Sequence, residues 1–165
     1  MHSVARDVSC LLVRELEGCR REVELFPDDQ SVWRTLPGVT NSAGNLTLHL
    51  VGNLQHFVGA VLGKTGYVRD RDAEFNRRSG PRTELVAGLD AAIKTVRDVL
   101  PSLSDNALDQ PYPEPVMGTT VRTGFYLVHL ATHAAFHLGQ IGYLRRALTG
   151  DARTSGAVPV RVLVE

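Results

Sequence analysis

One stretch organises the chain: Phe125-Tyr126-Leu127-Val128-His129-Leu130-Ala131-Thr132-His133-Ala134-Ala135-Phe136-His137-Leu138-Gly139-Gln140-Ile141. Three of the six histidines recur here every four residues. In a helix, four residues advance the side-chain direction by about 40° and the axis by about 6 Å, so neighbours in the series share a face. The same line contains the core-type residues Phe125, Ile141, Leu144 and Leu148, which predicts that the histidines point inward. Because buried imidazoles are costly without partners, a bound metal is the first hypothesis.

The size and charge of the chain favour one soluble domain. Its 165 residues suit a single hydrophobic core, which we expect over about residues 3–150, with a tail at 151–165. Eighteen basic and eighteen acidic side chains balance, which disfavours a nucleic-acid or anionic membrane partner. The N-terminal residues do not resemble a signal peptide, and no apolar run approaches the roughly 18 residues of a membrane span. These features predict a cytoplasmic protein.

The two cysteines, Cys10 and Cys19, lie nine residues apart without a CxxC spacing. Both fit the apolar positions of one amphipathic helix. We therefore expect two buried free thiols in a reducing compartment.

Apolar periodicity predicts four helices, which is typical of an all-α four-helix bundle. Ser42 or Asn41 is the expected N-terminal cap of the second helix, Thr83 that of the third, and Gly150 the C-terminal cap of the fourth. The second helix is apolar nearly all round, which is typical of a central position. The expected ranges are about 3–25, 43–64, 83–100 and 121–149.

The connections differ in length. Residues 67–81 carry mixed charges without periodicity and predict a long crossover loop between the second and third helices. Tyr67 and Phe75 within it suggest that it is docked on the bundle. Residues 102–120 contain three prolines and predict an irregular connection. A short β-like run at 158–164 has no predicted place in the bundle.

Pitch limits how the histidines can bind one ion. His129 and His137 are about 12 Å apart along a helix axis, whereas metal–nitrogen bonds are about 2 Å long. Only one pair, His129 with His133 or His133 with His137, can therefore share an ion. His49 on the second helix is a sensible third ligand, and His56 is its rival.

The acid content of the helices indicates the class of metal. Di-iron and di-manganese bundles need several inward glutamates, but the second and fourth helices contain neither Asp nor Glu. A neutral three-histidine set leaves the charge of a divalent ion uncompensated and suits a Lewis acid, with zinc the first choice and nickel the second. The alternative is that the histidines are core residues without a metal. The run Arg69–Asp72 is typical of a solvated loop.

Two motifs resemble the DinB/YfiT-like superfamily of metal-dependent four-helix proteins. His133-Ala134-Ala135-Phe136-His137-Leu138-Gly139-Gln140-Ile141 resembles its HxxxHxGQ[IV] signature, and Leu48-His49-Leu50-Val51-Gly52-Asn53 resembles its single-histidine motif. The segment 67–75 is similar to the crossover of one subgroup. Order and spacing agree over about residues 5–150.

The resemblance implies that His49, His133 and His137 are the metal ligands, and it assigns His129 and His56 structural or supporting roles. It also implies an up-down-down-up bundle, a divalent metal and a homodimer. Some members of this superfamily are S-transferases or a thiol-dependent isomerase that use a low-molecular-weight thiol such as bacillithiol or mycothiol.

The sequence therefore leaves three alternative functions. The first is a metal-dependent S-transferase that joins a small thiol to an electrophilic substrate, with a polar funnel above the metal formed by Gln140, Asn53 or the Arg69/Arg71 loop. The second is a metal-dependent hydrolase or a metal-binding bundle without catalytic activity. The third is a bundle whose histidines bind no metal.

Overall fold

A computed structural model of the chain describes residues 4–155, which form helices joined by turns and loops, without a β-strand in that range. This confirms the all-α class. The only strand-like pairings in this part of the chain are two isolated bridges, between Pro111 and Arg122 and between Val116 and Thr119. Within the same residues, no helix combines the length and apolar character needed to cross a bilayer. The β-like run at 158–164 lies outside the described residues.

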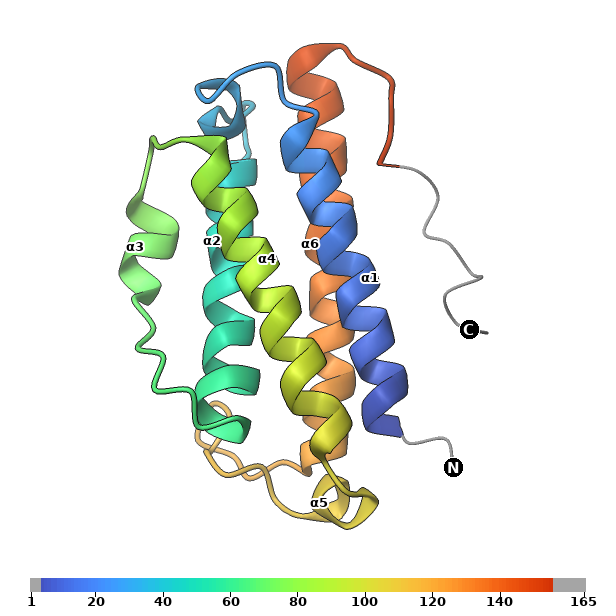
Figure 1. Cartoon of the computed structure of the whole chain (residues 1–165). Coiled ribbons are helices and arrows are strands. Elements are labelled where there is room, and N and C mark those ends of the chain that lie inside the picture. The colour runs from blue at the N-terminus through green and yellow to red at the C-terminus, as the bar shows by residue number, and fades with distance from the viewer. Residues whose placement is uncertain (1–3, 156–165) are drawn as a thin grey trace.

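Four long helical segments run along one another (Figure 1). In that view α1 and α6 rise from bottom to top, whereas α2 and α4 descend. α1 packs against α6 and α4, and α2 packs against α4 and α6. The long segments are α1 (Val4–Glu24), α2 (Ala43–Leu54) continued by η2 (Gln55–Leu62), α4 (Arg82–Val99) and α6 (Thr123–Thr149).

Shorter elements fill the connections. The turn between α1 and α2 contains η1 (Ser31–Trp33), and the crossover expected to be a loop contains α3 (Arg71–Asn76), which lies alongside α2 (Figure 1). The connection expected to be irregular contains η3 (Leu100–Ser102) and α5 (Asp105–Asp109).

The helix ends follow local hydrogen bonding. Ser42 begins α2 with a reciprocal capping box, in which its hydroxyl accepts from the Asn45 backbone and its own N–H faces the Asn45 side chain. Gly150 ends α6 in the left-handed conformation at a φ of 68°, as expected. The prediction for Thr83 is wrong: α4 begins one residue earlier, after Pro81, and no side chain caps it. Pro81 restricts the preceding backbone, so the helix starts directly behind it.

The second helix does not stay α-helical to its end. From Gln55 to Leu62 it widens into a π-helix, with the Gly63 N–H donating to the Val58 carbonyl five residues back. Within this segment the Phe57 carbonyl accepts a 2.6 Å hydrogen bond from the hydroxyl of Tyr112. An outside donor of this kind competes with the regular helix ladder and favours such a distortion.

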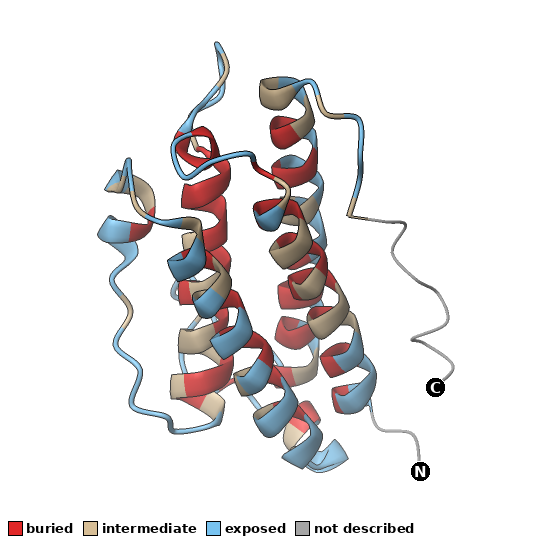
Figure 2. Ribbon diagram, turned by 45° about the horizontal axis from the view of Figure 1, so that its top comes forward, coloured by how far each residue is buried: buried red, intermediate tan, exposed pale blue. Residues whose placement is uncertain are grey.

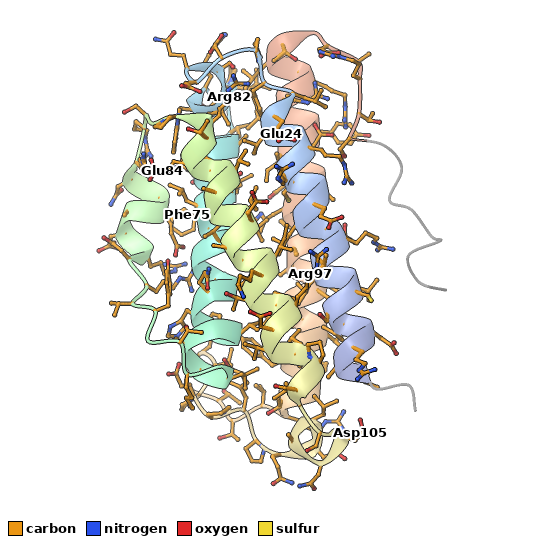
Figure 3. All side chains as sticks on the ribbon, viewed as in Figure 1. Glu24, Phe75, Arg82, Glu84, Arg97 and Asp105 are labelled. Atoms are coloured by element: carbon orange, nitrogen blue, oxygen red, sulfur yellow. The ribbon has the colours of Figure 1, made fainter. Side chains whose placement is uncertain are left out.

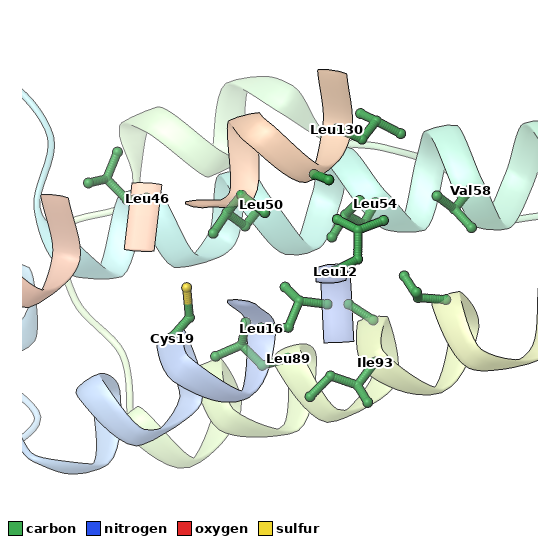
Figure 4. Packing of buried hydrophobic residues seen from close by; sticks show 14 of the residues in the cluster. Leu12, Leu16, Cys19, Leu46, Leu50, Leu54, Val58, Leu89, Ile93 and Leu130 are labelled. Carbon is green, nitrogen blue, oxygen red and sulfur yellow. The ribbon is translucent and has the colours of Figure 1, made fainter. Parts of the chain in front are cut away.

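The buried faces of the long helices meet in one core (Figure 2). Leu12 of α1, Leu54 of α2, Leu89 of α4 and Leu130 of α6 all belong to it and are 0–1% exposed (Figure 4). The apolar face of α4, which includes Leu85 and Leu89, is also buried.

Three predicted core assignments are wrong, those of Phe125, His129 and Cys10, and the angle between residues around a helix explains each. Phe125 is 65% exposed, whereas Ile141 is fully buried. Four steps of about 40° place these two residues about 160° apart around the helix, so a spacing of four winds from the surface into the core. Cys19 is buried but Cys10 is exposed, with both thiols free. A spacing of nine is two and a half turns and places the two cysteines on opposite faces.

Candidate metal centre

Three imidazoles from two helices converge beside the core. His49 comes from the middle of α2, and His133 and His137 come from successive turns of α6. His133 Nε2 lies 3.2 Å from His49 Nε2 and 3.0 Å from His137 Nε2. One nitrogen from each ring lies within 4.8 Å of the other two. His49 is buried, and the other two are half-buried.

The two rival histidines lie outside this group. His129 is exposed on α6, where its ring stacks on that of His133 with the centroids 5.8 Å apart. His56 lies in η2, and its Nε2 is 3.2 Å from a carboxylate oxygen of Glu114. The π-helix that carries His56 turns by a smaller angle per residue than an α-helix, so its register departs from that of His49.

A carboxylate from the crossover supports His49 from behind. Glu74 of α3 is buried, and its Oε2 lies 3.0 Å from His49 Nδ1. Arg69 donates from Nε and Nη2 to the two oxygens of Glu74, at 2.7 and 2.8 Å. Burial opposes ionisation of Glu74, but the hydrogen bonds from Arg69 and His49 outweigh it and hold the pKa of the carboxyl below its usual value. Phe75, the next residue, projects from α3 toward α2 (Figure 3), with its ring 4.9 Å from that of His49.

Sequence reasoning missed Glu74 because it counted acids only on the helices that face each other. Asp70 was the available signal in this segment, because it is a residue type that caps helices. It caps the short α3, which carries Glu74, by accepting from the Ala73 N–H. The expectation of a solvated loop holds for the exposed Asp70, Arg71 and Asp72, but not for Arg69, whose side chain is only 13% exposed.

Gln140 supports His137 in the same way. Its Oε1 lies 2.6 Å from His137 Nδ1, one helical turn further along α6. Because the side-chain oxygens of Gln140 and Glu74 are acceptors, the Nδ1 atoms of His137 and His49 carry the protons. In the neutral form of each ring, the Nε2 atom then presents a lone pair toward His133.

This arrangement of lone pairs fits a cation. His133 Nε2 can donate one proton at most, so it can satisfy only one of the two Nε2 atoms that face it at 3.2 and 3.0 Å. Burial and the neighbouring positive groups lower the pKa of His133 to about 4, which keeps its imidazole neutral near pH 7. Burial also lowers the pKa of His137, although its hydrogen bond to Gln140 opposes the shift. Two metal–nitrogen bonds of about 2.0–2.1 Å at a tetrahedral angle span about 3.3–3.4 Å, close to both observed separations.

A pocket of about 530 Å³ opens next to His137 and Gln140. Its other walls come from the segment 36–41, from Leu46 of α2 and from the C-terminal part of α6, including Tyr143 and Leu144. Most of this lining is apolar, and Gln140 is the one expected funnel residue that belongs to it. The Arg69/Arg71 loop and Asn53 do not line it, although Asn53 is buried and its Oδ1 has no hydrogen-bond partner among the described residues.

A sequence model described as the DinB superfamily matches residues 11–141 of the chain, which is more than half of its length. The match includes all three histidines of the cluster together with Glu74 and Gln140. A comparison with curated protein sequences gives no significant match.

Proposed function

Since the chain belongs to the DinB superfamily, we propose that it is a divalent-metal protein whose ligands are His49, His133 and His137. We further propose that it acts as a metal-dependent S-transferase, which joins a low-molecular-weight thiol to an electrophilic substrate. The observation that carries the metal proposal is the convergence of three imidazole nitrogens at 3.0 and 3.2 Å, two of them on rings whose Nδ1 atoms face Glu74 and Gln140.

The residues of the chain would divide the work of such a site. A divalent ion held by three neutral imidazoles lowers the pKa of a thiol or water molecule that shares it. His49 and His137 offer fixed Nε2 lone pairs because Glu74 and Gln140 accept their Nδ1 protons. In the transfer, the thiol proton passes to solvent and the sulfur forms a bond to the electrophilic carbon. The leaving group departs with its bonding electron pair.

Zinc is the proposed metal and nickel the second choice, because both accept imidazole ligands. The donors brought together are nitrogens, and the nearby Glu74 carboxylate is committed to His49 and Arg69. This set differs from the oxygen-rich sites that suit magnesium, calcium or manganese.

The first experiment is elemental analysis of the purified protein and of a His133→Ala/His137→Ala variant. We expect about one divalent ion per chain in the parent and a near-complete loss in the variant. The matched control is His56→Ala/His129→Ala, which removes two histidines outside the cluster and should keep the ion. Equal metal content in the parent and the His133/His137 variant would refute the assignment.

The chemistry is tested separately from the metal. Metal-loaded protein should consume a thiol such as cysteine, glutathione, mycothiol or bacillithiol in the presence of a reactive aryl halide, and the halide release should match the thiol consumed. A loaded protein that instead releases product from ester substrates without any thiol would be the metal-dependent hydrolase. Loaded protein without either activity would be a metal-binding bundle.

We also propose a homodimer that forms across the outer face of α6. Phe125, Phe136 and Tyr143 lie within about 20° of one another around this helix and are 65, 62 and 75% exposed. A Cβ added at the adjacent Gly139 would meet no atom within 4 Å, so the glycine leaves room for another helix to approach. Light scattering should give twice the chain mass for the parent and a smaller mass for Phe136→Asp. A monomeric parent would refute this part.

The remaining parts of the proposal concern topology, location and partners. The directions of the long helices (Figure 1) support an up-down-down-up four-helix bundle with α3 on the crossover. The two free cysteines suit a cytoplasmic protein, and the balanced charge suits one without a nucleic-acid or membrane partner. Cell fractionation and a DNA-binding titration at low salt test these two points.

A further inference from the structure

The pocket beside His137 has the size of a small-molecule site. Its volume of about 530 Å³ falls within the range of about 300–1,000 Å³ that is typical of such sites. It adjoins the histidine cluster directly, because His137 forms part of its wall. A molecule held there would therefore place one end at His137, the member of the cluster that lines the pocket.

The chemistry of the walls differs from that of the opposite side of the cluster. Leu36, Val39 and Leu46 contribute aliphatic surface, and Tyr143 contributes an aromatic ring. Among the described residues, no Asp, Glu, Lys or Arg side chain lines the pocket. The positive group nearest the cluster, Arg69, lies instead behind His49, where Glu74 occupies it.

One polar group is placed where it can orient a ligand. Gln140 uses its Oε1 to accept from His137 Nδ1, which turns its amide nitrogen away from the imidazole. Two N–H donors of a side chain that lines the pocket are thereby left for an acceptor atom of the ligand. Thr40 and Asn41 add polar atoms at the segment 36–41.

From these contacts we infer that the pocket holds the electrophilic substrate, and that this substrate is an uncharged, mainly apolar molecule with a hydrogen-bond acceptor near its reacting end. The inference rests on the proposed function, since it names the substrate class of the same centre. An anionic substrate would lose its hydration without a positive partner in this pocket, which is costly.

A pair of dyes tests the charge preference directly. N-phenyl-1-naphthylamine and 8-anilinonaphthalene-1-sulfonate share one aromatic skeleton and differ by a sulfonate, and both fluoresce more strongly in apolar surroundings. We expect the neutral dye to bind at least about tenfold more tightly, because the sulfonate has no partner in the pocket. Equal or tighter binding of the sulfonate dye would overturn the inference.

Matched variants assign the binding to this pocket. Thr40 lines the pocket and Thr35 does not, yet both are exposed residues of the same connection. Thr40→Trp should weaken the neutral dye by about tenfold by filling the pocket, whereas Thr35→Trp should leave it unchanged within about twofold. Thr40→Lys should tighten binding of the sulfonate dye, whereas Thr35→Lys should not. Indistinguishable effects at the two positions would place the dye elsewhere and refute the assignment.

Failure of this inference can be distinguished from failure of the metal proposal. The dyes are measured on the protein as purified and again after treatment with a chelator, with the metal content determined in both samples. Discrimination between the dyes in both samples supports the pocket assignment, whatever the metal content is. Metal-loaded protein that does not discriminate overturns the pocket assignment and leaves the metal site intact.

Discussion

Gly52→Ala should weaken metal binding without touching any of the three histidines. Gly52 lies on α2, three residues after His49, next to the carboxylate of Glu74. A Cβ built on Gly52 would lie 2.0 Å from Glu74 Oε1 and 2.8 Å from its Cδ. Real Cβ atoms essentially never approach a heavy atom so closely, and Glu74 is the group that must move, because the helix backbone is held by its own hydrogen bonds.

The size of the effect follows from what Glu74 holds. Displacing its carboxylate by an ångström or more breaks the 3.0 Å contact with His49 Nδ1 and disturbs both hydrogen bonds from Arg69. Loss of such a partner behind a metal-bound histidine typically weakens metal affinity by about 10–100-fold, or about 1.4–2.8 kcal/mol. The added methyl group also favours the helix by up to about 1 kcal/mol, so the folded state should survive.

The assay is competition with a chromophoric zinc chelator, combined with thermal unfolding of the metal-free protein. Gly88→Ala is the matched control, because Gly88 lies inside α4 and its added Cβ would meet only Val51 at an ordinary 3.4 Å. This control should bind metal like the parent. Glu74→Gln should reproduce most of the affinity loss caused by Gly52→Ala. If Gly52→Ala binds zinc within about twofold of the parent, Glu74 does not set the affinity of His49 and the reasoning fails.

Three further predictions concern reactivity and stability. In the native protein a thiol reagent should modify the exposed Cys10 quickly and the buried Cys19 only after denaturation. Burial shields the Cys19 thiol and raises its pKa. Rapid modification of both thiols in the native protein would contradict this. Glu22→Ala should lower the free energy of unfolding in urea by about 3–5 kcal/mol, because it leaves the fully buried Arg145 guanidinium without the carboxylate 2.6 Å away. A decrease below about 1 kcal/mol would contradict this prediction. Ser42→Ala should cost about 1 kcal/mol in the same urea unfolding through loss of the α2 cap, and Ser42→Thr, which keeps a hydroxyl to accept from the Asn45 N–H and donate to Asn45 Oδ1, should restore most of it.

The sequence predicts the long helices well because each buries a continuous apolar stripe of its own. The observed bounds of α1 and α6 differ from the expected ones by one or two residues, and Gly150 ends α6 as its conformational freedom requires. The wrong core assignments arise because the direction of a side chain around the helix axis shifts by about 40° with each step of four residues, and this shift accumulates over several turns. Phe125 and Ile141 belong to one series of positions spaced by four, but they lie on different faces of α6. The π-helix after Leu54 includes Phe57, whose carbonyl accepts from the hydroxyl of Tyr112, a residue distant in sequence.

In the histidine cluster, likewise, the spacing within one helix predicts one part, whereas the other part depends on how two helices pack. His133 and His137 can be paired from the sequence alone, because one helical turn separates them. Their partner His49 depends on how α2 packs against α6, which the spacing within either helix does not determine. The family resemblance supplied that choice, and the structure brings the three nitrogens within 4.8 Å of one another.

The second and fourth helices carry no acid, but an acid does approach the cluster from the crossover, where Glu74 reaches His49. Its charge, however, is paired with Arg69 through two hydrogen bonds of 2.7 and 2.8 Å, so the pair adds no net charge beside the three neutral imidazoles. A divalent ion at this position would keep most of its charge for the molecules that share it, which is the property that thiol or water activation requires. Glu74 would thus orient a proposed ligand without neutralising the site, and Arg69 is the residue that would make this possible. Arg69→Met should therefore leave Glu74 as an uncompensated carboxylate beside His49, tightening zinc binding while reducing the activation of a bound thiol.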